Sequence, residues 1–367
     1  MKERFEVLDI FRGILASLVV FFHLSAFSNT PIINNNFVHN CDLFVDFFFV
    51  LSGFVIAYNY QNIDNLLKLR SFYKKRFLRL YPLHLVVFLA FVLIEISKHY
   101  VSGMVHVNKM VDGGDYFATS LSNIFLLNSV KLPGINDVSW NIASWSISAE
   151  MIAYLVFGLI IFSTNWNFIS KFRKTIAVSI VFITVISLRL FTGGYSLMHS
   201  FDFGFCRGIL GFFTGCVCFY TFDSLKLYLR TISKNMFTIA ELVLVAGIVT
   251  LVFYGAIFKP YGYLFEGLFF ITILTFSFEQ GWLSTYLKKS KFLQSTGKYS
   301  YSIYMVHTLV LSLFNVLFIR ILKFPPSAYL YLFIPNYILI YFIAKWTYRN
   351  IEMRFNQIPF KSKIQAD

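Results

Sequence analysis

Long apolar runs recur from one end of the chain to the other, and they constrain the fold more than any other feature. A helix needs roughly 20 consecutive apolar residues to cross the hydrocarbon core of a bilayer. The ten runs close to this length lie at about 8–27, 41–60, 80–98, 142–163, 175–192, 200–222, 236–258, 261–279, 299–319 and 328–348. The sequence therefore predicts an all-α fold, a polytopic transmembrane helical bundle with about ten spans.

The composition supports this fold and excludes other classes of protein. Hydrophobic residues make up 57% of the chain and charged residues 14%, whereas soluble domains carry about 25% charged residues. A disordered chain and an ordinary soluble enzyme are therefore excluded. The four cysteines show neither the spacing of a metal site nor that of a disulfide framework. We expect no metal and no resident cofactor.

The charge pattern predicts the orientation. The net charge of +14 arises from Lys and Arg residues that cluster between the apolar runs, which is typical of cytoplasmic loops rather than of nucleic-acid binding. Both termini are expected to be cytoplasmic, in a multi-pass protein of the cell membrane whose partner is the bilayer. We divide the chain into a transmembrane domain, 1–350, and a short basic cytoplasmic tail, 351–367. Within that tail Glu352 is expected to be a surface charge.

One further apolar run is too short to be counted as a span. Residues 116–130 include Asn123 and Asn128, and we expect the segment to be re-entrant or interfacial. If it crossed the membrane, every later loop would change sides and the charge asymmetry would be lost.

Ionisable residues within the spans are candidates for function because their burial in a membrane is costly. Arg12 and His23 share the first span and lie about three helical turns apart on one face. Asp46 lies at a similar depth in the second span. A lone His can be a hydrogen-bonded core residue, but a carboxylate beside it would make it a general base. We therefore predict contact between His23 and Asp46, because consecutive spans with a short connection usually pack together.

The fourth span opens with the segment SWSISAE, residues 144–150. Ser146 and Glu150 are four positions apart and share one helical face. Glu150 is either a functional carboxylate or a structural partner of Arg207, which enters the sixth span from the same side. The three glycines that follow this arginine, Gly208, Gly211 and Gly215, are expected to allow close helix packing.

The ninth span and the loop after the second span contribute two more candidates. Ser300, Tyr304 and His307 fall on one helical face, and His307 has either a packing or a catalytic role. Residues 74–82 form a dense basic cluster, KKRFLRLYP. Such a cluster can simply mark the cytoplasmic side, but arginines one helical turn apart can also bind phosphate bidentately.

Several of these segments together carry a family resemblance. The chain resembles the acyltransferase 3 family of integral-membrane O-acyltransferases. The matching segments run in the family's order from end to end: LDIFRGILASLVVFFH (8–23), VDFFFVLSGF (45–54), KRFLRLYP (75–82), SWSISAE (144–150), YSYSIYMVH (299–307) and, more weakly, YRNIEMRF (348–355). No C-terminal SGNH-type domain, as some members carry, is expected.

The resemblance implies a function and a set of site residues. An acyl-CoA, expected to be acetyl-CoA, would donate its acyl group to a hydroxyl of a cell-surface glycan or a lipid-linked sugar. The resulting assignments are catalytic for His23, Asp46 and Glu150, donor-binding for Arg12, Arg76, Arg79 and Tyr81, and substrate-binding for Ser146, Trp145, Arg207 and His307. The hydroxyl would attack the thioester directly or an acyl group held on the enzyme.

Two other functions remain compatible with the apolar composition. A transporter or flippase for a glycolipid or a small polar solute would also line its path with buried charges. A purely structural membrane protein does not account for ionisable residues at matched depth. The arginine and histidine elements together favour the enzyme.

Overall fold

The computed structural model describes residues 4–101, 113–134, 140–165, 170–194 and 196–356. Within them the regular structure is helical, apart from one isolated antiparallel bridge between Val130 and Phe203. The prediction of an all-α fold is confirmed.

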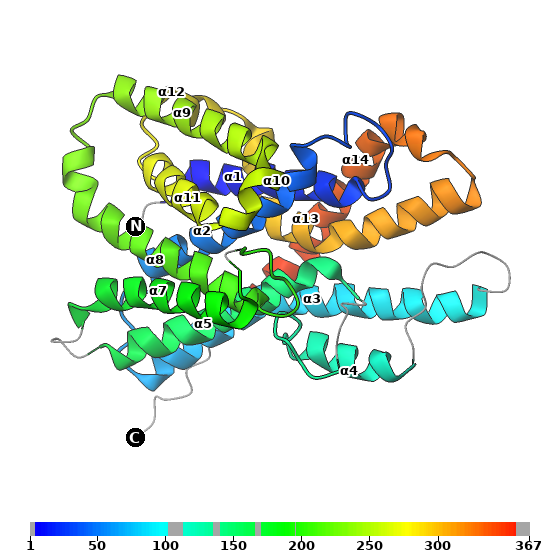
Figure 1. Ribbon diagram of the computed structural model, residues 1–367, viewed down its shortest axis with the longest axis horizontal. Helices are drawn as coiled ribbons and strands as arrows, with labels where there is room; N and C mark the ends of the chain where they lie inside the picture. The colour runs from blue at the N-terminus through cyan, green and yellow to red at the C-terminus, as the bar shows by residue number, and fades with distance from the viewer. Residues whose placement is uncertain (1–3, 102–112, 135–139, 166–169, 195, 357–367) are drawn as a thin grey trace.

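The long helices run along the long axis of the molecule (Figure 1). The α-helices are α1 (Glu6–Leu24), α2 (Phe44–Asn59), α3 (Leu66–Val101), α4 (Gly113–Ile124), α5 (Trp145–Ser163), α7 (Arg173–Thr192), α8 (Gly204–Leu229), α9 (Lys234–Phe253), α10 (Gly255–Phe258), α11 (Tyr263–Phe276), α12 (Trp282–Leu287), α13 (Lys291–Asn315), α14 (Tyr329–Thr347) and α15 (Met353–Asn356). The 3₁₀ and π segments are η1 (Val38–Leu43), η2 (Ile142–Ser144), η3 (Lys259–Tyr261), η4 (Val316–Ile321), η5 (Pro326–Ala328) and η6 (Tyr348–Glu352).

Among the described residues, nine helical segments are long and apolar enough to cross a membrane. A tenth crossing is present if the bent pair formed by residues 255–261 and α11 is counted as one span. The predicted number of about ten spans is therefore confirmed.

The predicted span at 261–279 corresponds to α11, which is the second arm of a bent pair of helices. The two arms of the bent pair meet at 97°, at a break flanked by Pro260 and Gly262. The second arm, α11, has 14 residues and is about 21 Å long, short of the roughly 30 Å hydrocarbon core. The apolar run was correctly located, and the bend lies at its start, where Pro260 just before it cannot continue a regular helix.

The segment at 116–130 is also too short to span. It forms α4, which has 12 residues and a length of about 18 Å, followed by turns. This agrees with the prediction that the segment does not cross the membrane.

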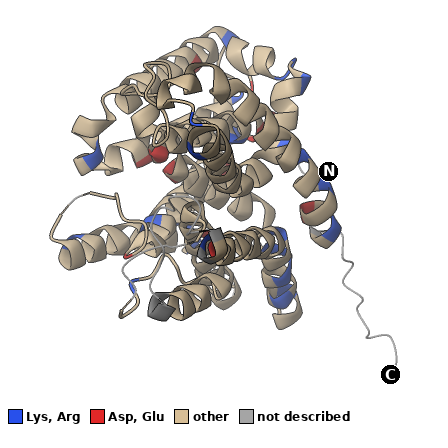
Figure 2. Cartoon of the chain, turned by 90° about the vertical axis from the view of Figure 1, so that its right-hand side faces the viewer, with Lys and Arg blue, Asp and Glu red and all other residues tan. Residues whose placement is uncertain are grey.

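The helices differ strongly in how much of their surface the rest of the protein covers. In the segment Val38–Asn59, which contains α2, 72% of the most apolar stretch is buried, and in α8 the value is 67%. In α7 and α9 it is only 17%. Viewed along the bundle, the flanks are mostly uncharged (Figure 2). Thus α2 and α8 form the centre, whereas α7 and α9 present apolar side chains to lipid.

Glycines bring the central helices into backbone contact. A Cβ atom at Gly13 of α1 would lie 2.4 Å from the backbone nitrogen of Gly297 on α13. A Cβ atom at Gly53 of α2 would lie 1.8 Å from the carbonyl oxygen of Phe212 on α8. From the α8 side, Gly215 packs against the backbone of α2 in the same way. The main partner of α1 is therefore α13, and that of α2 is α8.

The other two glycines of α8 also allow neighbouring helices to approach closely. A Cβ atom at Gly208 would lie 2.7 Å from the side chain of Ala149 on α5, and one at Gly211 would lie 2.7 Å from Phe49 on α2. The packing role predicted for the α8 glycines is confirmed.

The start of α1 and the segment after α14 lie at one end of the bundle. Arg4, just before α1, lies within electrostatic range of the Tyr348 hydroxyl on η6. An even number of crossings requires this arrangement. We call this end the terminal end, and the other the far end.

Candidate functional site

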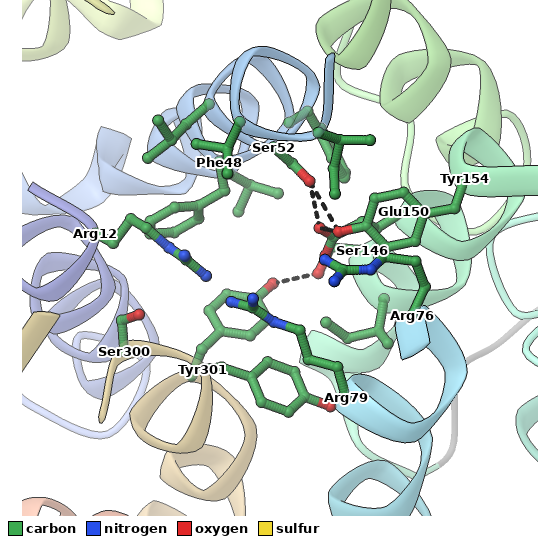
Figure 3. Close-up of a pocket in the computed structure, with 17 residues that line it drawn as sticks. Arg12, Phe48, Ser52, Arg76, Arg79, Ser146, Glu150, Tyr154, Ser300 and Tyr301 are labelled. Carbon is green, nitrogen blue, oxygen red and sulfur yellow. Dashed lines mark hydrogen bonds between the residues drawn. The ribbon is translucent and has the colours of Figure 1, made fainter. Parts of the chain in front are cut away.

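A pocket with a volume of about 80 Å³ lies between α1, α2, α3, α5 and α13. Figure 3 shows it with the polar side chains converging from different helices. Its lining consists of Arg12, Val45, Phe48, Phe49, Leu51, Ser52, Val55, Ile56, Arg76, Arg79, Ser146, Ile147, Glu150, Tyr154, Ser300, Tyr301 and Tyr304. Five of the predicted site residues meet here: Arg12, Arg76, Arg79, Ser146 and Glu150.

Three guanidinium groups face the pocket. Arg12 comes from α1, while Arg76 and Arg79 lie one turn apart on α3, and their side chains point toward the same space (Figure 3). Within the described part of the chain, Arg12 and Arg79 form no hydrogen bond and no ion pair. Arg76 donates to the Tyr60 hydroxyl at 3.3 Å, and its Nε is buried without a partner.

Glu150 is the one carboxylate in the lining. Its Oε1 accepts a hydrogen bond from Ser52 at 2.6 Å and another from Tyr154. The Ser52 and Tyr154 hydroxyls also lie 2.9 Å apart. The guanidinium of Arg76 stacks over the Tyr154 ring, 5.9 Å from its centroid. The carboxylate is thus fixed by hydroxyls and leaves the arginines free for a ligand.

Ser146 and Tyr304 close the pocket toward the far end. Their hydroxyl oxygens are 2.8 Å apart, and the Tyr304 hydroxyl also donates to the carbonyl of Ala143 at 3.2 Å. Deeper in the bundle, Tyr301 donates to the carbonyl of Leu80 on α3 at 2.5 Å. These bonds tie α13 to α5 and α3 around the cavity.

Glu352 is not the surface charge that we expected. It is 6% exposed and accepts a hydrogen bond from Ser302 of α13 at 3.1 Å. It also lies within electrostatic range of Arg79 and Arg12. The expectation was wrong because the last spanning helix continues into the π-helix η6, which places Glu352 against α13. The charges of the tail sequence had indicated an exposed segment instead. Such π segments often occur at functional sites.

Asp46 and Arg207 form a buried ion pair outside the pocket lining. Arg207 donates from Nε to Oδ1 at 2.6 Å and from Nη2 to Oδ2 at 2.8 Å. The guanidinium also stacks on the Trp145 ring, 5.2 Å from its centroid. Both side chains of the ion pair are at most 3% exposed. This bidentate arrangement satisfies both oxygens of Asp46.

The ion pair overturns two predictions about partners. In the described structure no hydrogen bond or ion pair joins Asp46 to His23, because Asp46 is bound to Arg207 of α8. Arg207 is likewise not the partner of Glu150. The consecutive helices α1 and α2 do touch, for example through the rings of Phe11 and Phe47, but each packs more extensively against another helix, α1 against α13 and α2 against α8.

A further carboxylate near this ion pair went unnoticed in the sequence. Glu266 of α11 is 5% exposed, and neither of its oxygens has a hydrogen-bond partner in the described structure. One of them lies 3.3 Å from where a Cβ atom of Gly211 would be. The glycine therefore makes room for the carboxylate. Its position in an apolar run was the signal that could have identified it.

The two histidines singled out in the sequence are brought together. The rings of His23 on α1 and His307 on α13 have centroids 5.0 Å apart and an interplanar angle of 42°. Nδ1 of His307 lies 2.6 Å from the carbonyl oxygen of Tyr304, while its Nε2 is buried without a partner. The pair lies one helical turn beyond Tyr304, on the far side of the pocket.

Tyr81 does not line the pocket. Its ring stacks on Phe77 with centroids 4.3 Å apart, away from the three arginines. Ser52, Tyr154 and Tyr301, in contrast, line the pocket and were not predicted. Tyr154 could have been found, because it is four positions after Glu150 and lies on the same helical face.

The pocket has the charge of an anion site. Three arginines face one carboxylate in its lining, with Glu352 behind them. Among the described residues, no group of three His, Cys, Asp or Glu side chains could hold a metal ion. The arrangement suits an anionic ligand with several acceptor oxygens.

Comparisons with known proteins point in one direction. A family profile described as an acyltransferase domain, acyltransferase 3, matches residues 5–345. Acyltransferase MdmB of Streptomyces mycarofaciens is 32% identical over 115 residues, which cover 31% of this chain and 27% of that protein. Protein 2 in the picA locus of Rhizobium radiobacter is 27% identical over 191 residues, which cover 50% of this chain and 93% of that protein. No solved structure matches.

Proposed function

The chain belongs to the acyltransferase 3 family and is a membrane acyltransferase, and we propose that it transfers an acetyl group from acetyl-CoA to a sugar hydroxyl. The acceptor would be a cell-surface glycan or a lipid-linked sugar, and the membrane would be the cell membrane. The profile match extends over nearly the whole chain, whereas the match to MdmB covers about a quarter of that protein. The donor and acceptor are therefore argued from the site.

The observation that carries the proposal is the set of unpaired arginines. Buried or half-buried guanidinium groups without carboxylate partners are costly in a membrane protein, so an anionic ligand is needed to balance them. A coenzyme A molecule supplies phosphate oxygens that match the bidentate geometry of Arg12, Arg76 and Arg79.

The size of the pocket supports a short acyl group. A volume of about 80 Å³ has room for a few water molecules or a small ligand group, which suits an acetyl group. The phosphates would lie against Arg12, Arg76 and Arg79 in the lining, with the rest of the nucleotide toward the terminal end. The thioester end would enter between α2 and α5, whose apolar side chains, including Phe48 and Ile147, form the pocket wall.

His23 remains our candidate for the general base. It would remove the proton of the acceptor hydroxyl as that oxygen attacks the acyl carbonyl carbon, either on the thioester or on an acyl group held by the enzyme. Glu150, held by Ser52 and Tyr154, would act in the pocket itself, whereas His23 lies beyond its far side. Arg207 is fully engaged by Asp46 and Trp145, so we now assign it to the support of the bundle rather than to acceptor binding.

Mass spectrometry of the glycans and glycolipids of a deletion strain tests the proposal. We expect one acyl group to disappear, and to return when the wild-type chain is supplied. The mass of the missing group identifies the acyl chain, and the fragment that carried it identifies the acceptor. An unchanged set of acyl groups, together with accumulation of an unmodified solute or lipid on one side of the membrane, would instead favour a transporter.

A further inference from the structure

His307 is a buried imidazole whose orientation is set by its own helix. A carbonyl oxygen can only accept, so the 2.6 Å contact with Tyr304 places the ring hydrogen of neutral His307 on Nδ1. The other nitrogen, Nε2, then carries a lone pair. This atom is buried and has no partner in the described structure. An acceptor of this kind is costly to bury unless it is used.

The segment around His307 is held firmly in place. Asn141, which caps η2, donates to the carbonyl of Met305 at 3.2 Å and accepts from Thr308 at 2.8 Å. Tyr304 is bound to Ser146 of α5. His307 is therefore positioned from both sides by hydrogen bonds to neighbouring elements.

The ring that faces His307 belongs to His23. The two rings are in contact without a hydrogen bond between them in the described structure, but their separation is close to that of a hydrogen-bonded pair, whose centroids are about 5 Å apart for a donor–acceptor distance of about 2.9 Å. The observed separation is 5.0 Å. His307 is 0% exposed, whereas His23 is half-buried. Of the two rings, His23 is the one with an exposed part, so we take it as the ring that meets the substrate.

No carboxylate of the described structure takes the place of His307. Asp46 is bound to Arg207 through both oxygens. Asp42, which lies within electrostatic range of His23, forms an ion pair with Lys259 at 2.8 Å. The imidazole of His307 is the free acceptor beside the His23 ring.

We propose that His307 is the positioning residue of His23, with its Nε2 accepting the ring hydrogen of His23. The other ring nitrogen of His23 is then presented as a base to the acceptor hydroxyl. This inference rests on the proposed acyl transfer and adds to it the residue that orients the base.

The transfer then balances as follows. The hydroxyl proton passes to His23 while the hydroxyl oxygen forms a bond to the acyl carbonyl carbon. The carbon–sulfur bond of the thioester breaks, and the proton on His23 passes to the leaving sulfur to give the free thiol of CoA. His307 keeps its own hydrogen on Nδ1 throughout and stabilises the transient imidazolium through Nε2.

The test uses inverted membrane vesicles from a deletion strain that expresses the full chain or a variant. Such vesicles carry the native acceptor and expose the cytoplasmic face to added acetyl-CoA. Release of the CoA thiol gives kcat and KM at matched protein levels. All four cysteines of the chain are buried, so a thiol reagent reports on CoA.

The decisive variants are His307→Phe and a matched control, His84→Phe. His84 is also buried, with Nε2 at 2.9 Å from the Asn123 carbonyl and Nδ1 without a partner, but it lies outside the pocket lining. We expect His307→Phe to lower kcat at least about tenfold with an unchanged KM for acetyl-CoA, and His84→Phe to keep the wild-type kcat. Equal losses in both variants, or an unchanged kcat in His307→Phe, would overturn the proposal.

A second comparison separates orientation from packing and does not depend on the Phe variant. The amide of His307→Gln lies where Nε2 was, whereas that of His307→Asn lies where Nδ1 was. If Nε2 positions His23, Gln retains more activity than Asn. The reverse order would show that only the bond to Tyr304 matters. Wild-type vesicles that release no more CoA than the deletion strain would contradict the acyl transfer itself, a result distinct from either of these.

Discussion

Arginine plays two different parts in this bundle, and the difference lies in its partners. Arg207 is matched by both oxygens of Asp46 and by the Trp145 ring, which makes it part of the structure. Arg79 and Arg12 face a cavity without any such partner among the described residues. The same side chain therefore stabilises the fold in one place and provides a binding site in the other.

The unpaired arginines lead to a prediction about donor binding. Replacing Arg12, Arg76 or Arg79 with Ala should weaken CoA binding by about tenfold to hundredfold each, because a hydrogen bond to a charged group contributes about 1.5–3 kcal/mol. Arg79→Lys should recover part of the affinity, since an ammonium lacks the planar fork. Calorimetric titration of the purified protein with CoA measures this.

Arg70→Ala is the matched control for that series. It removes the same charge from α3 but at an exposed position outside the pocket lining. If it weakens CoA binding as much as Arg79→Ala does, the effect comes from general surface charge and the pocket assignment fails.

The buried ion pair leads to a prediction about stability. Asp46→Asn leaves the Arg207 charge without compensation, and breaking a buried pair costs about 3–5 kcal/mol. The double replacement with Leu at both positions should be less destabilising than Asp46→Asn alone, because no unpaired charge remains. Thermal unfolding in detergent measures the order of the variants. If Asp46→Asn unfolds at the same temperature as the wild type, the ion pair contributes little to the stability of the fold.

At the scale of the helices, which side chains meet depends on which helices pack together, and these are often not consecutive in the chain. Arg12 and Glu150 were conspicuous as charges within apolar runs and Arg79 as part of the basic cluster at 74–82, so all three could be identified, and they do converge. The partner of Asp46 could not be predicted, because it depends on α2 packing against α8. That choice follows from Gly53 and the α8 glycines, whose pairing is visible only in three dimensions.

The close contact of α2 and α8 can be tested directly. Gly215→Ala would place a Cβ atom 1.9 Å from the carbonyl oxygen of Val50, and backbone atoms cannot move aside as a side chain can. We expect a loss of about 1–3 kcal/mol or more, seen as a lower unfolding temperature in detergent. Gly267→Ala on α11 meets nothing within 4 Å and should be neutral or slightly stabilising. Equal effects of the two substitutions would contradict this account of the packing.

For the whole molecule, the approximate number of membrane-spanning helices followed from the sequence, while two features did not. The 97° bend before α11 and the inward π segment carrying Glu352 both depend on local backbone geometry, which hydropathy does not register. The His23–His307 contact depends on α1 packing against α13, which are almost 300 positions apart in the chain. Hydropathy locates the spans in the sequence, but it does not predict which spans are neighbours in the bundle.

The orientation of the whole bundle remains a prediction from charge, and cysteine labelling can test it. Ser327, in the turn η5, should face outward, and Ser224, near the end of α8, should face the cytoplasm. Both side chains are exposed, and the four native cysteines are buried, so the background is low. A membrane-impermeant maleimide should label Ser327→Cys in intact cells and Ser224→Cys only after the membrane is opened. The opposite pattern would invert the orientation.

The placement of the three arginines has a consequence for the living cell. They would bind phosphates, which acetyl-CoA and spent CoA have in common, so the donor and the by-product should bind with similar strength. Turnover would then respond to the acetylation state of the coenzyme pool rather than to its size. We expect CoA to inhibit competitively with a Ki near the KM of acetyl-CoA, as rates at a constant total pool and varied ratio would reveal. Surface modification would slow whenever carbon supply falls and the pool becomes deacetylated.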